Sequence, residues 1–311
     1  MRLALTSRKE DAHDDAVWSA TWNNNNNSII SGSVDESVKN WSIGSSDAPA
    51  LDNLHTWTGH TLGVVSVDVD STGQTAVSSS LDSFIRVWGI ESHDTVAVIE
   101  TAPSETWQVK FHPNADKQLV AAAGGSSNQI MIYSMDADVV QTLQLPPVDA
   151  SRKKETFVLS LAYSPDGQRM ACGCMDGIVA MFDVETGKLL TSMEGHFKPV
   201  RSLAFTPDSR QLLTGCDDMH TQAYDVANGA VSASFSGHAS WVLSVTCHPD
   251  GTAFATGSSD SQVKLWDLRA QTCLQTLTDH TDQVWGVSFN KAGTHLASVS
   301  DDKSLAVYSY G

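Results

Sequence analysis

The stretch DSQVKLWDL, residues 260–268, decides the fold, because its spacing to an upstream histidine recurs along the chain. Trp266 lies six residues after Asp260, and His238 lies 22 residues before that aspartate. The same two intervals connect a histidine, an aspartate and an aromatic residue in four other places. These sets are His13, Asp35 and Trp41; His60, Asp82 and Trp88; His196, Asp218 and Tyr224; and His280, Asp302 and Tyr308. Such recurrence predicts a chain built from similar structural units.

Two further units keep only part of this pattern. One retains Asp176 and Phe182 with Lys154 at the histidine position, and the other has Ala102, Ser127 and Tyr133. The seven positions equivalent to Asp260 are 42 to 49 residues apart. Seven units of this length predict a closed repeat architecture, and we expect residues 1–311 to form a single domain.

Each unit contains short β-type runs separated by turn residues. SLAFTPDSRQLLTG (202–215) has two runs around Pro-Asp-Ser, and SLAYSPDGQRMACG (160–173) has two around Pro-Asp-Gly. These are hairpin patterns, and no segment shows a convincing period of 3.6 residues. With Gly-His before the first strand and Trp-Asp at the end of another, the chain resembles the WD40 family. The resemblance implies an all-β fold, a seven-bladed WD40 β-propeller with four strands in each blade.

The two ends of the chain are predicted to meet in the last blade. The last unit finishes with SLAVYSYG (304–311), so no fourth strand follows its third strand. RLALTSRK (2–9) is a short alternating segment without a unit of its own. We therefore expect residues from about 2 to 8 to complete the last blade and leave no open sheet edge.

The WD40 resemblance also assigns a structural role to the repeated residues. In this family the histidine, a strand hydroxyl, the aspartate and the tryptophan form a hydrogen-bonded chain inside the blade. The matching hydroxyls lie four residues before each aspartate: Ser31, Ser78, Thr214, Thr256 and Ser298. An imidazole between a carboxylate and a hydroxyl also resembles a Ser-His-Asp catalytic triad. Because five copies recur at one period, whereas a hydrolase needs one set, we interpret them as structural and predict no catalytic residue.

The composition favours protein partners over nucleic acid. Acidic side chains number 36 and basic ones 19, so the formal net charge is −17, whereas a sequence-independent grip on DNA or RNA needs Lys and Arg. The five cysteines are odd in number and lack zinc-site spacing, which predicts reduced thiols in an intracellular protein with no metal and no cofactor. The sequence has no signal peptide and no apolar run of ~20 residues, so we expect no association with membranes.

A partner surface is predicted from the residues three and five positions after each histidine position. In a strand these two positions share one side, and in the family that side is the top face near the central channel. The predicted partner-binding residues are Trp18, Trp107, Trp241, Trp285, Phe157 and Arg201. Large aromatic anchors of this kind suit an extended peptide. Val65, Leu159 and Leu243 occupy equivalent positions and are expected to pack between blades.

At finer grain the chain resembles one WD40 family in particular. AHDDAVWSATW (12–22), SGHASWVLSV (236–245) and DHTDQVWGVSFN (279–290) differ from generic WD40 sequence at positions outside the repeat motif. They resemble the WD40 subunit that the Ski (superkiller) complex shares with the RNA polymerase II-associated factor (PAF) complex, in its plant form, the vernalization-independence type.

That resemblance implies a non-catalytic scaffold, present as a monomer within hetero-oligomers in the nucleus and the cytoplasm. Its implied partners are the helical-repeat scaffold and RNA helicase of the Ski complex, in 3′-to-5′ exosome-dependent mRNA decay, and PAF subunits in transcription elongation and histone modification. The aromatic cluster and the acidic charge leave an alternative, a chromatin reader that binds a basic or methylated histone tail on the top face. An enzyme is the weakest interpretation, because the sequence has no unique metal-ligand cluster, phosphate loop or solitary nucleophile.

Overall fold

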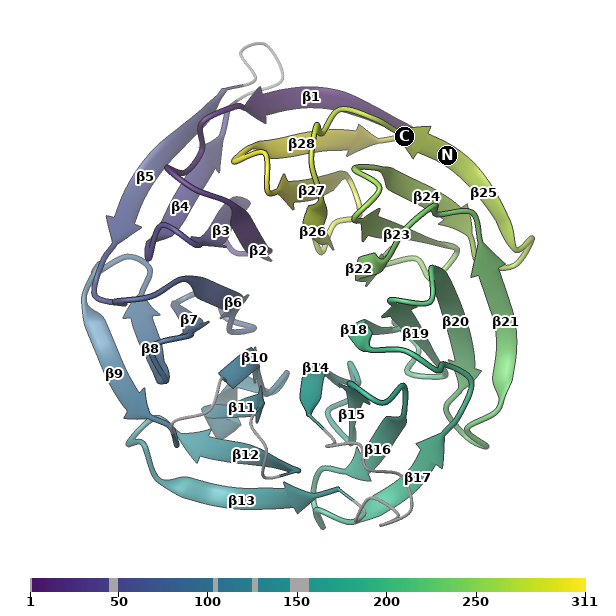
Figure 1. The fold of residues 1–311 in the computed structure, drawn as a ribbon. Helices are drawn as coiled ribbons and strands as arrows, with labels where there is room; N and C mark the ends of the chain where they lie inside the picture. The colour runs from purple at the N-terminus through teal and green to yellow at the C-terminus, as the bar shows by residue number, and fades with distance from the viewer. Residues whose placement is uncertain (1, 45–49, 103–105, 125–127, 146–156) are drawn as a thin grey trace.

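The computed structural model describes residues 2–44, 50–102, 106–124, 128–145 and 157–311. These residues form seven four-stranded antiparallel sheets, which surround a central channel like blades (Figure 1). Within each blade the first strand lies next to the channel and the last lies on the outer rim. The prediction of a seven-bladed all-β propeller is confirmed.

The strands follow the chain in order through the first three blades. Blade 1 consists of β2 (Val17–Asn23), β3 (Ser28–Ser33), β4 (Val38–Ile43) and β5 (Leu51–Trp57). Blade 2 consists of β6 (Val64–Val69), β7 (Thr75–Ser80), β8 (Phe84–Gly89) and β9 (Thr95–Glu100). Blade 3 consists of β10 (Thr106–Phe111), β11 (Leu119–Gly124), β12 (Gln129–Ser134) and β13 (Val139–Gln144), with the short 3-10 helix η1 (Ala115–Lys117) between its first two strands.

The next three blades repeat the same arrangement. Blade 4 consists of β14 (Val158–Tyr163), β15 (Arg169–Cys174), β16 (Val179–Asp183) and β17 (Leu189–Met193). Blade 5 consists of β18 (Val200–Phe205), β19 (Gln211–Cys216), β20 (His220–Asp225) and β21 (Val231–Ser236). Blade 6 consists of β22 (Val242–Cys247), β23 (Ala253–Ser258), β24 (Val263–Asp267) and β25 (Thr272–Leu277). Across the described ranges, no helix has the length and apolar character needed to cross a bilayer.

Blade 7 joins the two ends of the chain. It contains β26 (Val284–Phe289), β27 (His295–Ser300) and β28 (Leu305–Tyr310), and its outer strand is β1 (Leu3–Lys9). The strand β1 runs antiparallel to β28, with Leu3 opposite Tyr310 and Lys9 opposite Leu305. The side-chain amide of Gln275, from blade 6, also bonds both the N–H and the carbonyl of Leu3 at 2.8 Å. Closure by the N-terminal strand, as predicted, leaves the termini side by side (Figure 1).

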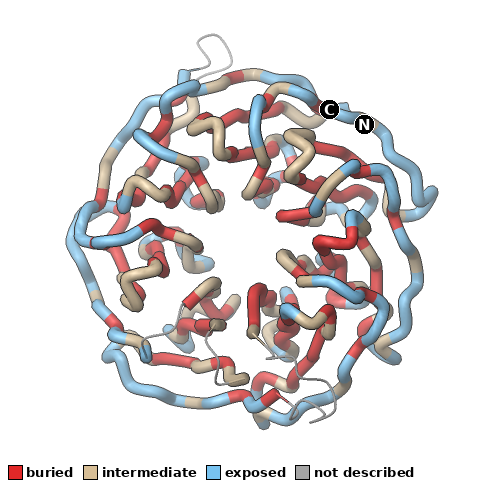
Figure 2. Tube along the Cα trace, viewed as in Figure 1, coloured by how far each residue is buried: buried red, intermediate tan, exposed pale blue. Residues whose placement is uncertain are grey.

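The core lies between neighbouring blades rather than inside any one sheet. The middle strands are mostly buried, the inner strands mix buried and half-buried residues, and the outer strands are mostly exposed (Figure 2). One cluster, for example, joins Val38 and Trp57 of blade 1 to Val64 and Trp88 of blade 2. Burying one such aliphatic or aromatic side chain contributes about 1.5–3 kcal/mol, so every blade depends on both of its neighbours.

Candidate partner-binding site

A hydrogen-bonded chain crosses the top of blade 6. The indole N–H of Trp266 donates to the Thr256 hydroxyl at 2.8 Å, and that hydroxyl lies 2.7 Å from Nε2 of His238. Nδ1 of His238 then lies 2.9 Å from the Asp260 carboxylate, which also accepts the backbone N–H of Ala239 at 2.9 Å. The aspartate therefore connects the loop that enters the blade to the loop between its second and third strands.

The same chain occurs in four other blades. Nδ1 of the histidine lies 2.6–3.0 Å from the aspartate and Nε2 lies 2.6–2.8 Å from the hydroxyl. These sets are His13, Ser31 and Asp35; His60, Ser78 and Asp82; His196, Thr214 and Asp218; and His280, Ser298 and Asp302. Trp41 and Trp88 donate to their blade's hydroxyl at 2.8 Å, whereas the Tyr224 hydroxyl donates to Gln222 instead.

The electrostatics favour a charged carboxylate in blade 6 and a neutral imidazole in blades 1 and 2. Burial would raise the pKa of Asp260, but hydrogen bonds from His238 and the Ala239 N–H outweigh it and lower the pKa to about 2. Burial lowers the pKa of His13 and of His60 by more than their aspartates raise it. Each of the five histidine side chains is at most 1% exposed, so no substrate can reach it. The geometry supports a structural role.

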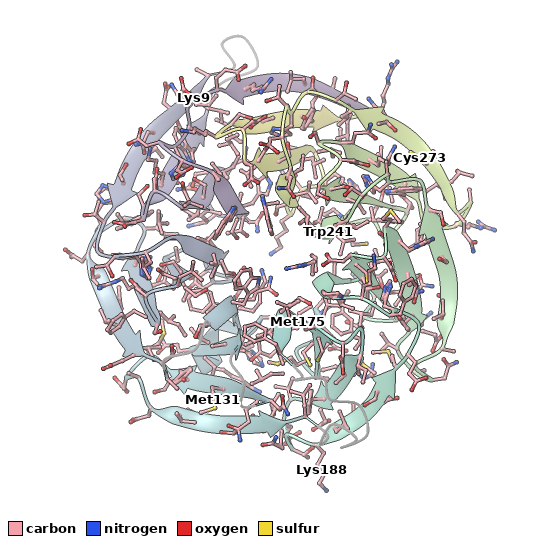
Figure 3. The ribbon with its side chains drawn as sticks, in the orientation of Figure 1. Lys9, Met131, Met175, Lys188, Trp241 and Cys273 are labelled. Carbon is pink, nitrogen blue, oxygen red and sulfur yellow. The ribbon has the colours of Figure 1, made fainter. Side chains whose placement is uncertain are left out.

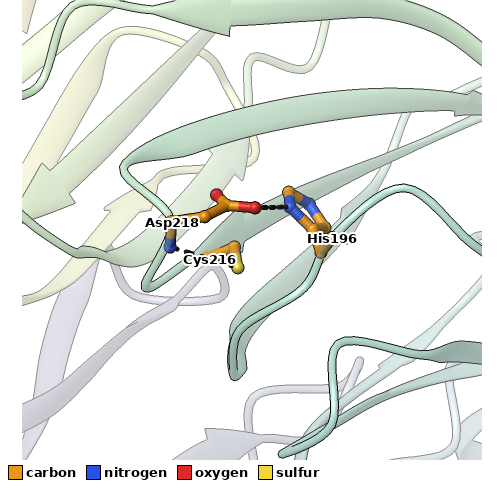
Figure 4. Close-up of side chains that lie close together, drawn as sticks. All are labelled: His196, Cys216 and Asp218. Atoms are coloured by element: carbon orange, nitrogen blue, oxygen red, sulfur yellow. Dashed lines mark hydrogen bonds and ion pairs between the residues drawn. The ribbon is translucent and has the colours of Figure 1, made fainter.

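Blade 5 also brings together three possible metal ligands, His196, Cys216 and Asp218 (Figure 4). The Cys216 thiol donates to the carbonyl of Lys198, and burial raises its pKa, so the thiol is protonated. The four other blades with a complete chain have serine at this position, and Ser80 makes the same bond to the carbonyl of Leu62. The three side chains are thus explained by the hydrogen bonds of the blade, without a metal ion.

Blades 3 and 4 lack this chain in the part of the molecule that the structure describes. Ala123 and Cys172 occupy the hydroxyl positions, and Lys154 and Ser127 lie outside the described residues. Asp176 accepts the N–H of Ile178 at 3.2 Å, a bond within its own turn.

The top of the channel is shaped by a β-bulge in every inner strand. In all seven blades the pairing between the first two strands shifts by one residue, immediately after the strand begins. The extra residue is the one five positions after the histidine position: Trp18, Val65, Trp107, Leu159, Arg201, Leu243 or Trp285. A bulge redirects its side chain. All seven residues line the channel cavity of about 450 Å³.

The prediction that positions three and five share one side of a strand is wrong. The strand begins four residues after the histidine, so the third position, which includes Trp241 and Phe157, belongs to the preceding loop. Those two residues are absent from the cavity wall. Val65, Leu159 and Leu243, expected to pack between blades, also line the channel, and Leu159 and Leu243 are buried, with 4% of each residue exposed.

Two tryptophans meet where blade 7 adjoins blade 1. The rings of Trp18 and Trp285 are 5.7 Å apart at 45°, and the Trp18 indole N–H donates to Asp301 at 3.1 Å. Burial raises the pKa of Asp301, and the nearby charges of Asp282 and Asp15 raise it further. Asp301 therefore places a half-buried carboxyl group next to two aromatic rings.

Blades 5 and 6 form a second cluster at the channel mouth. Both oxygens of Asp217 accept hydrogen bonds from Arg201, at 2.9 and 2.8 Å. The guanidinium carbon of Arg201 lies 5.7 Å from the centre of the Trp241 ring, a cation–π distance. Trp241 is 44% exposed and lies on the inner side of its blade, beside the central opening (Figure 3). Arg201 thus holds the position of an exposed aromatic ring.

The other two predicted partner-binding residues, Trp107 and Phe157, are less exposed than Trp241 and belong to other blades. Trp107 is half-buried and belongs to blade 3, and Phe157 is half-buried with its carbonyl bonded to the N–H of Met175. The structure adds Phe197, 69% exposed, and Met175, 49% exposed, both on top-face loops. Phe197 directly follows His196, where the other four complete units have Asp14, Thr61, Ala239 and Thr281. A large apolar residue at this position of the repeat was the feature of the sequence that could have identified Phe197 as a surface residue.

Comparisons with known proteins agree with this architecture. A family model described as the first β-propeller of IFT122 matches residues 16–309. The WD repeat-containing protein VIP3 of Arabidopsis thaliana is 44% identical over 211 residues, which are 65% of this chain and 64% of VIP3. The WD repeat-containing protein SL1-17 of Schistosoma mansoni is 35% identical over 197 residues, 62% of this chain and 61% of that protein. The meiotic recombination protein rec14 of Schizosaccharomyces pombe is 28% identical over 195 residues, 62% of this chain and 60% of rec14.

The chain therefore matches somewhat less than two thirds of the length of these relatives. The similarity to VIP3 confirms the resemblance to the plant form that the sequence predicted.

Proposed function

This chain belongs to the β-propeller family whose model is described as the first β-propeller of IFT122, and from this premise we propose that it is a non-catalytic scaffold that binds partner proteins at the top of its channel. WD-repeat relatives such as VIP3 and SL1-17 support a protein-interaction role.

The observation that carries the proposal is the exposed ring of Trp241 on Arg201. The equivalent position holds Ala16, Gly63 and Gln283 in three other blades, so the fold does not require a tryptophan there. A 44% exposed indole held by a cation is the kind of anchor that dominates protein interfaces. An extended partner segment with one or two bulky side chains fits this site and the nearby Trp18–Trp285 pair.

At finer grain we propose that the chain is the WD40 subunit of the Ski mRNA-decay complex and of the PAF transcription-elongation complex. Its partners would be a helical-repeat scaffold and an RNA helicase in the cytoplasm, and PAF subunits in the nucleus. The resemblance to the plant family and the similarity to VIP3 support this assignment.

The test is affinity purification with the full chain and with Trp241→Ala, from nuclear and from cytoplasmic extracts. We expect subunits of both complexes with the parent, and about thirtyfold weaker binding by the variant, equivalent to ~2 kcal/mol. Thermal unfolding should be nearly unchanged, because the ring is largely in solvent. Leu54→Ala, at a 52% exposed position on the outer rim, is the control and should bind like the parent. Recovery of neither complex contradicts the finer proposal, and unfolding of the variant contradicts the surface role of Trp241.

A second candidate is a chromatin reader, and Asp301 is the observation that favours it. Its carboxylate lies beside Trp18 and Trp285 and accepts hydrogen bonds from Trp18 and Gln283. Among the described residues it pairs with no cation, whereas the equivalent Asp217 is already bound by Arg201. A lysine or methylated lysine of a histone tail would supply the missing positive charge. Tighter binding of methylated histone peptides than of Ski or PAF subunits, abolished by Asp301→Asn, would favour the reader.

A further inference from the structure

The outer rim of the propeller carries more apolar surface on one side of the ring than on the other. Blades 2, 3 and 4 each have two aliphatic side chains on the outer strand that are 38–57% exposed. These six residues, which we call the rim patch, are Val96, Val98, Val139, Val140, Leu189 and Leu190. The outer strands of blades 5 and 6, which the structure describes in full, have one each, Val231 and Leu274. An apolar patch that spans three neighbouring blades indicates a contact surface.

Half of the rim patch occupies β-bulges. In all seven blades the pairing of the outer strand with its neighbour shifts by one residue. From blade 1 to blade 7 the extra residues are Leu54, Val96, Val140, Leu190, Ser232, Leu274 and Thr6. Because serine and threonine serve at this position in blades 5 and 7, the fold does not require an aliphatic side chain there. A bulge also interrupts the row of backbone groups that an added strand would pair with, so contacts at this rim depend on side chains.

Acidic side chains surround the rim patch. In blades 2–4 the outer strand and the connection before it cover residues 91–100, 136–144 and 185–194, which contain one lysine, Lys188, pointing away from the ring (Figure 3). The same ranges contain seven exposed acids: Glu91, Asp94, Glu100, Asp136, Asp138, Glu185 and Glu194. The matching ranges of blades 5 and 6, residues 227–236 and 269–278, contain no acid and one arginine. The whole chain has 36 acidic and 19 basic residues, so the excess around the rim patch exceeds the general acidity of the protein.

We propose that the rim patch binds an amphipathic helix of a partner protein, with lysine or arginine on both sides of its apolar face. A helix presents its apolar side chains in one stripe and binds through side chains alone, which suits a rim whose strand edges are interrupted by bulges. The stripe covers aliphatic residues such as Val140 and Leu190, and the flanking positive charges face the seven acids. This surface lies on the outside of the ring, apart from Trp241 at the channel mouth, so it adds a second binding surface to the scaffold.

The charge of this rim disfavours a second copy of the chain as the occupant. A two-fold symmetric interface places the same surface patch on both subunits. The seven acids of one copy would then face the seven acids of the other, and like charges across an interface oppose binding. A basic partner has no such penalty.

The test measures binding of a labelled peptide to the full chain by fluorescence anisotropy. The peptide is a helix of about 18 residues with leucine along one face and lysine at the other positions. We compare the parent with Val140→Ser and Leu190→Ser, which place at each bulge the residue that blade 5 has there. Each variant should bind the peptide about tenfold more weakly than the parent. Leu274→Ser makes the same change at the bulge of blade 6 and should bind like the parent.

The charges of the rim are tested in the same assay. The double variant Asp136→Asn with Asp138→Asn should bind the lysine peptide several-fold more weakly, and added NaCl should weaken the binding by the parent. A peptide with glutamate in place of every lysine should not bind the parent. Two prolines in the middle of the lysine peptide break its helix and should weaken its binding by at least about tenfold.

The proposal is overturned if the parent does not bind the lysine peptide, if Leu274→Ser loses as much affinity as Val140→Ser, or if the proline peptide binds as tightly as the helical one. It is also overturned if light scattering shows dimers of the parent that Val140→Ser abolishes, because the rim patch would then bind a second copy. Trp241→Ala should bind the peptide like the parent, so a failure at the channel mouth is distinguished from a failure at the rim. Should a serine variant fail to fold, the double asparagine variant tests the same surface.

Discussion

Blade 6 and blade 4 have the same four antiparallel strands but differ in what connects their loops. In blade 6 the Thr256 hydroxyl joins Trp266 to His238, and Asp260 completes the chain. In blade 4 Cys172 and Phe182 occupy the positions of Thr256 and Trp266, and both are fully buried. Blade 4 nevertheless forms a complete sheet, so aliphatic and aromatic packing between blades builds the propeller. The hydrogen-bonded chain instead fixes how the top loops sit on each sheet.

The largest difference between these blades should come from the aspartate. Asp260→Ala leaves the buried imidazole of His238 without an acceptor and removes the bond to the Ala239 N–H. We expect a loss of about 3 kcal/mol in the free energy of unfolding, measured with urea. Asp176→Ala removes one bond within the described residues and should cost about 0.5–1 kcal/mol. Equal losses of unfolding free energy in the two variants would contradict the claim that the aspartate matters more in blade 6 than in blade 4.

The hydroxyl is the next test. Thr256→Val keeps the shape of the side chain but leaves Nε2 of His238 and the indole N–H of Trp266 without a partner. We expect a loss of about 2 kcal/mol by urea unfolding. Thr256→Ser is the control, because serine serves in three other blades, and it should lose less than about 1 kcal/mol. A serine variant as unstable as the valine variant would mean that packing, not hydrogen bonding, matters at this site.

Acid should weaken blade 6 through the same aspartate. The pKa of Asp260 is about 2 in the folded protein, below the 3.8 of a free carboxyl. The folded protein therefore binds fewer protons than the unfolded chain, and the stabilisation present above about pH 4 is lost as the pH falls towards 2. Unfolding free energies measured across this range should fall less steeply for Asp260→Asn than for the parent. Identical slopes would contradict a charged aspartate in this chain.

The smallest effect should come from the indole hydrogen bond itself. Trp266→Phe removes a donor that is bonded, whereas Trp57→Phe removes a buried indole N–H without a partner in the described structure. Both rings are 2% exposed and lose the same volume. The difference between the two losses of unfolding free energy should therefore be about 1 kcal/mol, the value of one hydrogen bond. No difference would show that the indole bond contributes nothing to the blade.

Much of this architecture could be predicted because hydrogen-bonding residues recur at fixed intervals. The intervals from His238 to Asp260 and Trp266 were enough to locate the blades and the hydroxyl Thr256. Closure by Leu3–Lys9 could be predicted because the last unit lacked a strand. The relative positions of Trp241 and Leu243 could not be predicted from the sequence. The strand begins only at Val242, after Trp241, and a bulge at Leu243 redirects that side chain.

Contacts between blades were also beyond prediction from the repeat. The rings of His55 and His93 stack with their centres 4.0 Å apart, and nothing in the sequence shows this contact, because each residue belongs to a different blade and a different kind of element. The same holds for Arg201, whose contact with Trp241 depends on how blade 5 faces blade 6. Phe197 was visible only as an apolar residue at a position that is otherwise small or polar.

The sequence by itself determined the number of blades, their hydrogen-bonded chains and the strand that closes the ring. It could do so because these features depend on intervals within one unit and on the missing strand of another. Only the tertiary structure decided which side chains meet at the channel mouth. Trp18 and Trp285 are far apart in the chain yet lie 5.7 Å apart, because closing seven blades into a ring makes the first blade a neighbour of the last.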